Sequence, residues 1–302
     1  MNGLTVKRPE VSVVICTRDR PELLRRVLAS LEEQTVERSR FEVIVVDNGG
    51  GIEELARTAG ADIVVREHEP GLSRARNAGW RAAASELVAY LDDDAIAEKD
   101  WLEQALRVYD ERNRAVAAMG GPALPLWDTP PPAWFPEDVE NRWFGDTERV
   151  LALGESLSGL NVFFARALLQ RLGGFDVRLG MRGDSIGVGE EADLFARMWA
   201  EDPDVLAVYS PAIAIRHLVA PYKISVRYQL RRAVAYGESV IIQQQIPRAY
   251  RRHMAWEYLR DVFCLTRGAL WRARPPLKRW ALEELEPAAV RWGMLRAVVA
   301  GK

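Results

Sequence analysis

The sequence predicts an α/β protein with a parallel sheet, because short apolar runs and amphipathic stretches alternate over residues 11–109. Four apolar runs, the first of them rich in β-branched residues, are typical of buried strands: residues 11–16, 41–46, 63–65 and 87–91. Three stretches carry helical signals: residues 21–31, which begin at a proline, 73–84 and 101–109. Strands separated by helices form parallel βαβ units with right-handed crossovers.

Beyond this region the elements are shorter and then wholly helical. Residues 161–165 are typical of a strand followed by a helix that ends at Leu172, and two short strands are expected at 205–209 and 212–216. After Pro221 three helices are expected: residues 225–244, 248–272 and 277–299. The chain contains no internal repeat and no low-complexity segment.

Three consecutive carboxylates, Asp92, Asp93 and Asp94, directly follow the apolar run 87–91. Carboxylates packed together at a strand end repel one another unless a cation or hydrogen-bond donors neutralise them. Hard divalent cations take oxygen ligands, and Mg²⁺ is commonly held by one or two carboxylates and substrate phosphates. The cluster therefore favours a metal–phosphate site at the sheet edge, and the alternative is a plain acidic turn.

Polar residues also follow two other strands, with Thr17 after the first and Asp47 after the second. The carboxyl ends of parallel strands share one edge, where ligands bind. Asp47 suits an imide N–H or a ribose hydroxyl, or it simply forms the turn into Asn48-Gly49-Gly50. No G-x-G-x-x-G follows the first strand and no G-x-x-x-x-G-K-[ST] occurs, which excludes a dinucleotide fingerprint and P-loop chemistry.

Arg74 and Arg76 lie in the first turns of the helix expected at 73–84. Cations at that end oppose the helix dipole, so a separate purpose is expected for them. A diphosphate would supply it, and the alternative is pairing with acidic neighbours at the surface.

A segment from Gly120 to Gly145 interleaves six prolines with five large aromatic residues. Proline at this density excludes a regular helix or a central strand. Aromatic faces on an irregular loop suit sugar rings, so we expect either a substrate-facing flap or a loop whose tryptophans cover the sheet.

The bulk composition narrows the class of protein. A net charge of −2 over 302 residues argues against a general nucleic-acid binder. The two cysteines, Cys16 and Cys264, indicate no disulfide framework, and residues 1–8 show no apolar signal core. No uninterrupted apolar stretch is long enough to span a bilayer. These features favour a cytoplasmic protein.

The average charge hides a polarity along the chain. Residues 221–302 hold 16 Lys+Arg and 6 Asp+Glu, a balance of +10, whereas the remainder holds 25 and 37, a balance of −12. Cationic helices that carry tryptophans can lie at the inner face of a membrane. The alternatives are packing against the acidic part of the chain, or a homodimer through these helices.

Several segments in order resemble family 2 glycosyltransferases of the GT-A fold. They are residues 13–21, 42–48, 71–79, 92–94, 173–176 and 189–197, and the resemblance covers about residues 10–220. It implies a Rossmann-like nucleotide-binding sheet in 1–120, an acceptor-binding and catalytic half in 121–220, and a helical extension in 221–302.

The resemblance also implies which residues bind the donor. The nucleotide-sugar site would comprise Thr17, Arg20, Asp47, Arg74, Asp92 and Asp93, with Arg74 near the base or diphosphate and Asp92 at the ribose. Asp94 would close a DXD motif and bind Mn²⁺ or Mg²⁺, with Asp92 beside it. His217 lies where many GT-A enzymes place a histidine ligand, although a structural histidine is equally expected, and imidazole suits Mn²⁺ better than Mg²⁺.

The catalytic base of the family usually belongs to a Glu-Asp pair before a helix, and this chain has Glu190-Glu191 instead. Position matching makes Glu191 the base, with Glu190 as a rival and Asp193 as a supporting residue. The alternative is that both glutamates merely favour the N-terminus of the helix.

The function that follows is inverting, metal-dependent hexosyl transfer from a nucleotide-diphosphate sugar, a UDP-sugar first, to an acceptor hydroxyl. That acceptor would be a glycan, a lipid-linked glycan or a small molecule. A nucleotidyltransferase on a related fold is one alternative, although its early glycine-rich, lysine-bearing loop is missing. A non-catalytic nucleotide-sugar binder is another, since the Glu190-Glu191 pair departs from the family's pattern.

Overall fold

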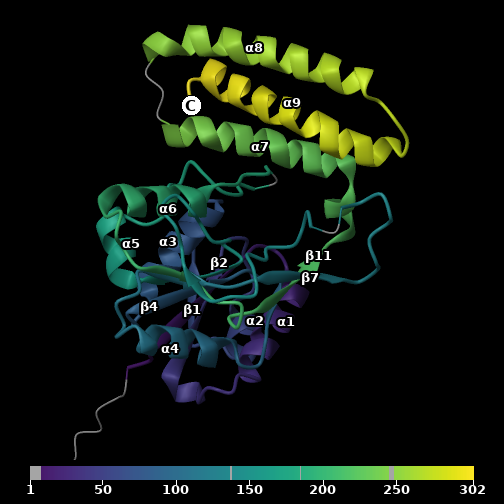
Figure 1. Cartoon of the computed structure of the whole chain (residues 1–302). Helices are drawn as coiled ribbons and strands as arrows, with labels where there is room; N and C mark the ends of the chain where they lie inside the picture. Colours follow the sequence, from purple (N-terminus) through teal and green to yellow (C-terminus); the bar gives the residue numbers. More distant parts are fainter. Residues whose placement is uncertain (1–7, 137, 184, 245–247) are drawn as a thin grey trace, which may run out of the picture. The chain divides into compact units, whose positions relative to one another are not determined.

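The computed structural model describes residues 8–136, 138–183, 185–244 and 248–302. The chain divides into two compact units (Figure 1). The first contains Met1–Leu126, Glu140–Val177 and Glu190–Leu218, and the second contains Trp127–Val139, Arg178–Gly189 and Val219–Lys302. Residues 1–7 lie outside the described part of the chain.

The first unit is built on an eight-stranded sheet with the order β3-β2-β1-β4-β9-β6-β10-β8. The four strands expected from the apolar runs form one half of it: β1 (Val11–Thr17), β2 (Phe41–Asp47), β3 (Ile63–Arg66) and β4 (Leu87–Leu91). All their pairings are parallel, as the alternation of strands and helices predicts. Their carboxyl ends therefore meet at one edge.

The other half of the sheet, outside the region for which parallel units were predicted, is mixed. β9 (Asn161–Ala165) runs antiparallel between β4 and β6 (Ala118–Gly120). β10 (Ala207–Tyr209) is parallel to β6, and the short β8 (Arg149–Val150) pairs antiparallel with β10. Among the described residues between β6 and β9 no helix is assigned, and a helix is the usual crossover between parallel neighbours.

A second sheet has the order β5-β11-β7, from β5 (Ala95–Ala97), β11 (Ile215–Val219) and β7 (Ala123–Trp127). β7 lies inside the proline-rich segment and contains Pro125, but it is an edge strand, where a missing N–H is tolerated. The strand expected at 212–216 is displaced to β11, because the turn that Ser210 and Pro211 begin extends to Ile213, whose N–H donates to the Ser210 carbonyl.

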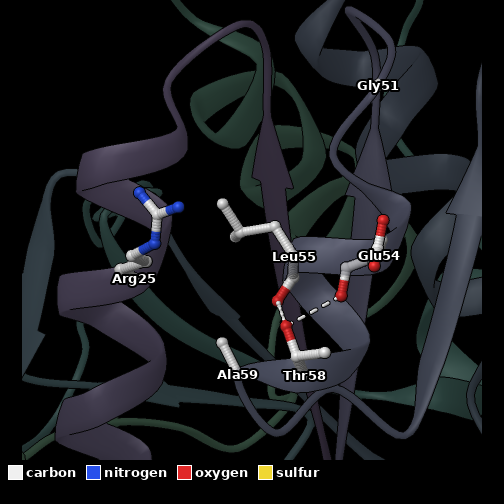
Figure 2. A pocket seen from close by; sticks show the side chains of 6 residues that line it. All are labelled: Arg25, Gly51, Glu54, Leu55, Thr58 and Ala59. Carbon is white, nitrogen blue, oxygen red and sulfur yellow. Dashed lines mark hydrogen bonds between the residues drawn. The ribbon is translucent and has the colours of Figure 1, made fainter.

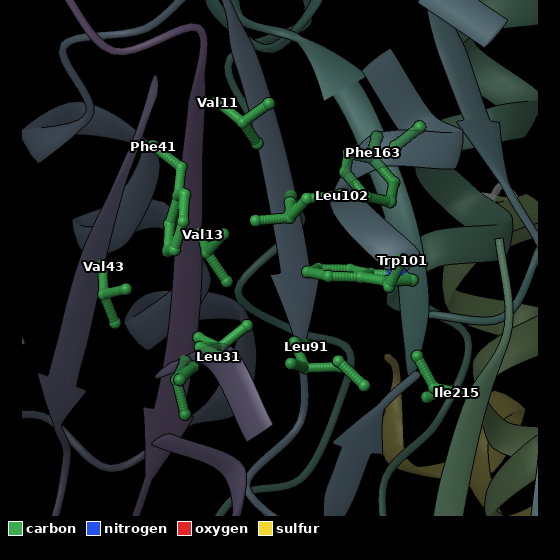
Figure 3. Close-up of a cluster of buried hydrophobic side chains, with 14 of the residues drawn as sticks. Val11, Val13, Leu31, Phe41, Val43, Leu91, Trp101, Leu102, Phe163 and Ile215 are labelled. Atoms are coloured by element: carbon green, nitrogen blue, oxygen red, sulfur yellow. The ribbon is translucent and has the colours of Figure 1, made fainter. Parts of the chain in front are cut away.

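Helices cover both faces of the large sheet and bury separate apolar clusters against it. One face packs against α1 (Pro21–Glu32), α2 (Glu53–Thr58) and α4 (Trp101–Glu111), and Figure 3 shows Trp101 and Leu102 lying over strand residues such as Val13 and Leu91. The other face packs against α3 (Leu72–Ala82), α5 (Arg166–Leu172) and α6 (Glu190–Glu201). A 3₁₀ turn, η1 (Arg38–Arg40), precedes β2.

The second unit is dominated by three long helices, as expected: α7 (Val226–Gln244), α8 (Arg248–Trp271) and α9 (Leu277–Ala300), with η2 (Pro221–Ile224) before them. Within this unit α9 packs against both α7 and α8 (Figure 1). Gly237 and Gly293 let α7 and α9 approach closely, since a Cβ at either position would collide with a carbonyl of the facing helix. None of the described helices has the length and apolar character to cross a membrane.

Candidate functional site

The triple aspartate lies at the carboxyl end of β4, and its middle member is turned inward. The Oγ1 of Thr17 donates to Oδ2 of Asp93 over 2.7 Å, and Nη1 of Arg20 donates to Oδ1 over 3.0 Å. Burial raises the pKa of Asp93 to about 6, while the Arg20 guanidinium acts in the opposite direction. Three of the predicted donor-site residues are thus brought together at one strand edge, with Asp93 tying β4 to the end of β1.

Asp47 is buried at the end of β2, where it organises the following turn. Its Oδ1 accepts from the backbone N–H groups of Gly49 and Gly50, at 3.1 and 2.7 Å. Its Oδ2 accepts from Nη1 of Arg66 over 2.7 Å. These contacts are those of a residue that forms a turn, which was the alternative to a nucleotide-binding role for Asp47. They also fix the loop at the sheet edge where the aspartates lie.

Asp94 and His217 face each other, with 3.5 Å between Oδ2 and Nε2, and both side chains are largely buried. Strand pairing explains the approach: β5 follows Asp94 directly, and its Ala95 is the register partner of His217 on β11. The backbone N–H of Leu218 also donates to the Asp94 carbonyl over 2.8 Å. Two residues 123 positions apart in sequence are thereby held as neighbours.

The predicted three-residue ligand set of Asp92, Asp94 and His217 is not assembled as a closed group. Over the described ranges of the chain, no three His, Cys, Asp or Glu side chains cluster closely enough to hold a metal on their own. The facing carboxylate and imidazole nevertheless fit a divalent ion whose remaining ligands are phosphate oxygens and water. Asp92 is instead engaged by an arginine.

That arginine is Arg76, whose side chain is only 3% exposed. Its Nη1 donates to Oε1 of Glu190 over 2.8 Å, and its Nη2 donates to Oδ1 of Asp92 and to the Gly159 carbonyl, at 3.0 and 3.1 Å. Burial acts to lower the pKa of Arg76, but the surrounding carboxylates outweigh it and the pKa is raised, so the side chain stays charged. One cation therefore joins the start of α6 to the aspartate cluster.

The two glutamates at the start of α6 have different surroundings. Glu190 is buried against Arg76, and desolvation together with the charge of Glu191 raises its pKa, against the effect of the guanidinium. Glu191 is partly exposed, and its Oε1 accepts from the Gly159 N–H over 3.3 Å. Its Oε2 has no hydrogen-bond partner among the described residues. Oε2 of Glu190 also lacks a hydrogen-bond partner there, so the two glutamates differ in their exposure and in the contact of Glu190 with Arg76.

Asp193 lies one turn further along α6 and contacts Arg197 rather than Glu190 or Glu191. Its Oδ2 accepts from Nε of Arg197 over 2.8 Å, and that arginine also donates to the carbonyls of Leu172 and Gly174. This arrangement anchors the first turns of α6 to the end of α5. Asp193 thus reaches the backbone after α5 through Arg197, and its supporting role in the site stays a prediction.

Arg74 lies on the other side of α3 from Arg76 and pairs with Glu69 at 2.9 Å. In this structure Arg74 therefore makes the surface ion pair that was the alternative to binding a diphosphate. In the proline-rich segment, Phe135 is buried edge-to-face against Trp127 and Trp134, whereas Trp143 and Phe144 are exposed. The segment thus partly covers a core and partly presents aromatic faces.

Sequence reasoning did not single out Asn77 or Gly159. Asn77 receives the N–H of Phe175 and donates to its carbonyl, at 2.9 and 2.8 Å, which fixes the loop after α5 to α3. Gly159 contacts both Arg76 and Glu191 through its backbone. Asn77 lies in the motif 71–79 and could have been suspected, but nothing in the sequence marks Gly159.

A separate surface hollow lies between α1 and α2, lined by Arg25, Gly51, Glu54, Leu55, Thr58 and Ala59 (Figure 2). None of the predicted site residues lines it, and within it the hydroxyl of Thr58 is used by the carbonyls of its own helix. The carboxylate-rich edge, and not this hollow, is therefore the candidate active site.

A parallel half-sheet with carboxylates at its edge is thus joined to a mixed half-sheet and to the carboxylate pair at the start of α6. Residues 12–138 match the family model described as glycosyl transferase family 2. Over 245 residues the chain is 30% identical to a glucosyl-dolichyl phosphate glucuronosyltransferase of Haloferax volcanii, covering 76% of this chain and 76% of that protein. The chain belongs to glycosyltransferase family 2.

Solved structures agree with this fold. A mannosyltransferase of Pyrobaculum calidifontis in complex with GDP-Man and Mn²⁺ superposes with a TM-score of 0.62 at 20% identity, over 96% of this chain and 88% of that one. Residues 1–349 of S. aureus TarS in complex with UDP superpose with a TM-score of 0.56 at 17% identity, over 97% and 92%. The chain is therefore a GT-A glycosyltransferase, an enzyme that acts on nucleotide sugars.

Proposed function

We propose that the enzyme transfers a sugar from a nucleotide-diphosphate sugar to an acceptor hydroxyl, with inversion and with the help of a divalent cation. The observation that supports this most is the pair of contacts made by Arg76. Its guanidinium binds Asp92 of the aspartate cluster and Glu190 at the start of α6. The side chain of Arg76 thus contacts both the aspartates proposed to bind the donor and the start of the helix that carries the proposed base.

Donor binding is assigned to the edge formed by the ends of β1, β2 and β4. Asp94 and His217 would hold Mn²⁺ or Mg²⁺ as part of a DXD-type site, since their facing oxygen and nitrogen suit such an ion. The bound cation would stabilise the charge that develops on the departing diphosphate. Asp92 is assigned to the ribose, and Asp93 positions Thr17 and Arg20.

The nucleotide is proposed to be UDP, with GDP as the alternative. Neighbours of the same fold are bound to UDP in one case and to GDP-Man in the other. Arg74 and Asp47 remain assigned to the nucleotide side of the site. Arg74 would exchange its solvent-exposed partner Glu69 for the donor, because an exposed ion pair contributes little.

Glu191 is proposed as the catalytic base. Inverting transfer requires a group that removes the proton of the acceptor hydroxyl while its oxygen attacks the anomeric carbon opposite the leaving diphosphate. Glu190 is buried and paired with Arg76, whereas Glu191 is partly exposed and accepts a long hydrogen bond from the Gly159 N–H. The backbone of Gly159 links the two glutamates, since its N–H donates to Glu191 and its carbonyl accepts from Arg76, the partner of Glu190.

The acceptor class is proposed to be a sugar carried on a lipid phosphate. The Haloferax volcanii relative, which aligns with 76% of this chain, is named for glucuronosyl transfer to glucosyl-dolichyl phosphate. The exposed Trp143 and Phe144 supply aromatic faces that suit a sugar ring.

The test is a transfer assay with UDP- and GDP-sugars, a divalent cation and a glycosylated lipid phosphate, in which release of the nucleoside diphosphate and the product anomer are followed by NMR. We expect turnover and an inverted anomeric configuration for the wild type. Glu191→Gln should bind the donor but lose sugar transfer. Glu201→Gln, at the far end of the same helix, should retain both donor binding and transfer. A retained configuration, or normal transfer by Glu191→Gln, would contradict the mechanism.

A further inference from the structure

α8 exposes a stripe of large apolar side chains to solvent. Its exposed residues recur every three or four positions and so share one side of the helix. We name this side the α8 outer face: His253, Trp256, Leu259, Arg260, Phe263, Cys264, Arg267, Leu270 and Trp271. The exposed fractions of Trp256, Phe263 and Trp271 are 71%, 66% and 92%. Five of the nine residues are large and apolar, which is unusual for a solvated helix face.

The opposite side of α8 already supplies its packing within the unit. Met254, Ala255 and Tyr258 pack with a core formed by Ile241 of α7 and Ala297 and Val298 of α9. The helix therefore does not need its outer face for its place in this unit. Leaving such side chains in water forgoes roughly 25 cal/mol for each Å² of apolar surface, so a binding partner is indicated.

The charges around the outer face indicate what that partner is. Arg260 and Arg267 lie within the apolar stripe, and within the described residues no ion pair involves Arg267. Trp271 leads into an exposed segment that carries four cations, Arg272 and Arg274 before α9 and Lys278 and Arg279 in its first turn. Arg272 and Arg279 also pair with Glu284 and Glu283 of α9. Leu277, the first residue of α9, is 61% exposed. The whole segment 221–302 has a charge balance of +10.

Tryptophan and aliphatic side chains interleaved with arginines match the surface of an anionic bilayer. Indole rings favour the headgroup region, aliphatic groups enter the acyl boundary, and arginines bind lipid phosphates. We propose that the α8 outer face and the segment from Trp271 to Arg279 bind an anionic membrane, with α8 lying in the plane of the interface. The inference is independent of the proposed acceptor, because binding to vesicles requires neither donor nor turnover.

The experiment is co-sedimentation of the full chain, without nucleotide, with vesicles of phosphatidylcholine alone and of phosphatidylcholine mixed with an equal amount of phosphatidylglycerol. We expect binding to the anionic vesicles, little binding to the neutral ones, and release at high salt. Trp271→Ala and Phe263→Ala should each lower the partition coefficient by about fivefold to tenfold. Leu153→Ala, which removes an exposed apolar side chain of the first unit, is the matched control and should leave binding unchanged.

The charge contribution is tested separately. Arg267→Gln should lower binding to anionic vesicles by about fivefold, while the exposed Arg171 of α5 serves as its control through Arg171→Gln. Equal binding of the wild type to both vesicle types, or none to either, would overturn the proposal. The proposal would also be overturned if the control variants lost as much binding to anionic vesicles as the variants of the α8 outer face.

A second readout separates a membrane from a second copy of the chain. Cys264 is exposed on the outer face and Cys16 is not, so an environment-sensitive fluorophore can be attached at Cys264. We expect a blue shift of its emission on adding anionic vesicles and no dependence on protein concentration without them. A concentration-dependent shift and a dimer in solution that Trp271→Ala dissociates, without vesicle binding, would show that the face binds another copy and would overturn the proposal.

Discussion

Arg76 and Glu190 form a buried ion pair, with 2.8 Å between Nη1 and Oε1, across 114 residues of sequence. The second amino group of the guanidinium binds Asp92 and the Gly159 carbonyl. A single side chain on α3 therefore binds two carboxylates of the candidate active site, Asp92 after β4 and Glu190 at the start of α6. A buried cation with two carboxylate partners is costly to disturb, because each partner would be left desolvated.

Arg76→Met is expected to lower the free energy of unfolding by about 3–5 kcal/mol, since Asp92 and Glu190 would lose their buried cation. Arg74→Met on the same helix removes a largely solvated pair with Glu69, for which about 0–1 kcal/mol is expected. Urea unfolding of both variants measures the difference. Equal losses would show that the Arg76 pair is not the stabilising contact described here.

Glu191→Gln and Glu190→Gln are expected to separate catalysis from architecture. Removal of a general base lowers turnover by about 10²–10⁴-fold, and this loss is expected for Glu191→Gln with the donor Kd unchanged. Glu190→Gln keeps a hydrogen-bond acceptor for Arg76, so a smaller loss is expected. Single-turnover rates with saturating donor give the comparison. The larger loss in Glu190→Gln would transfer the role of base to that residue.

Stability should depend on pH through Glu190. Burial and the charge of Glu191 raise its pKa in the folded protein above its ordinary value of 4.5. Its stabilising contribution is therefore fully present below pH 4.5 and is lost as pH rises through the raised value. A glutamine at this position does not titrate, so the free energy of unfolding of Glu190→Gln should rise relative to that of the wild type as pH increases. Urea unfolding over a pH series, with Glu201→Gln as control, measures this, and a constant difference would contradict it.

Gly174→Ala should be more damaging than Gly173→Ala, although both glycines have positive φ, at 77° and 74°. A Cβ at Gly173 meets nothing nearby, so that variant costs only backbone strain of about 1–3 kcal/mol. A Cβ at Gly174 would collide with Asn77, which holds Phe175 by two hydrogen bonds. Thermal unfolding of the two variants gives the comparison, and equal melting temperatures would contradict the role given to Asn77.

Much of the fold could be predicted because it depends on local patterns. The strands β1 to β4 are continuous apolar runs between helical signals, and the three long helices after Pro221 follow their own periodicity. The antiparallel direction of β9 could not be predicted in this way. Its apolar sequence suits either direction, and its partners β4 and β6 are both distant from it in sequence.

The candidate site was predictable to the extent that it lies at strand ends. Thr17, Asp47 and the aspartate cluster follow strands, so a shared edge brings them together. Arg74 and Arg76 have the same local signals, but residues two apart on a helix lie about 200° apart, so both cannot face inward. That Arg76 is the buried one depends on Glu190 and Gly159, which are distant in sequence.

His217→Ala tests the second residue assigned to the cation. If His217 and Asp94 hold a metal between them, this variant should require more Mn²⁺ for half-maximal donor binding while its fold is retained at saturating metal. Donor titrations at several Mn²⁺ concentrations measure the shift. The exposed His253 on α8 supplies the control, His253→Ala. An unchanged Mn²⁺ requirement would show that His217 is structural.

The most direct test is thermal stabilisation of the wild type and Asp94→Asn by UDP-, GDP-, dTDP- and CMP-sugars, each with Mn²⁺, Mg²⁺ or a chelator. We expect the melting temperature of the wild type to rise with a UDP-sugar only when a divalent cation is present. We expect this rise to be lost in Asp94→Asn. Stabilisation by a nucleotide sugar that persists in chelator, or that is the same in Asp94→Asn, would contradict a metal-dependent donor site at the end of β4.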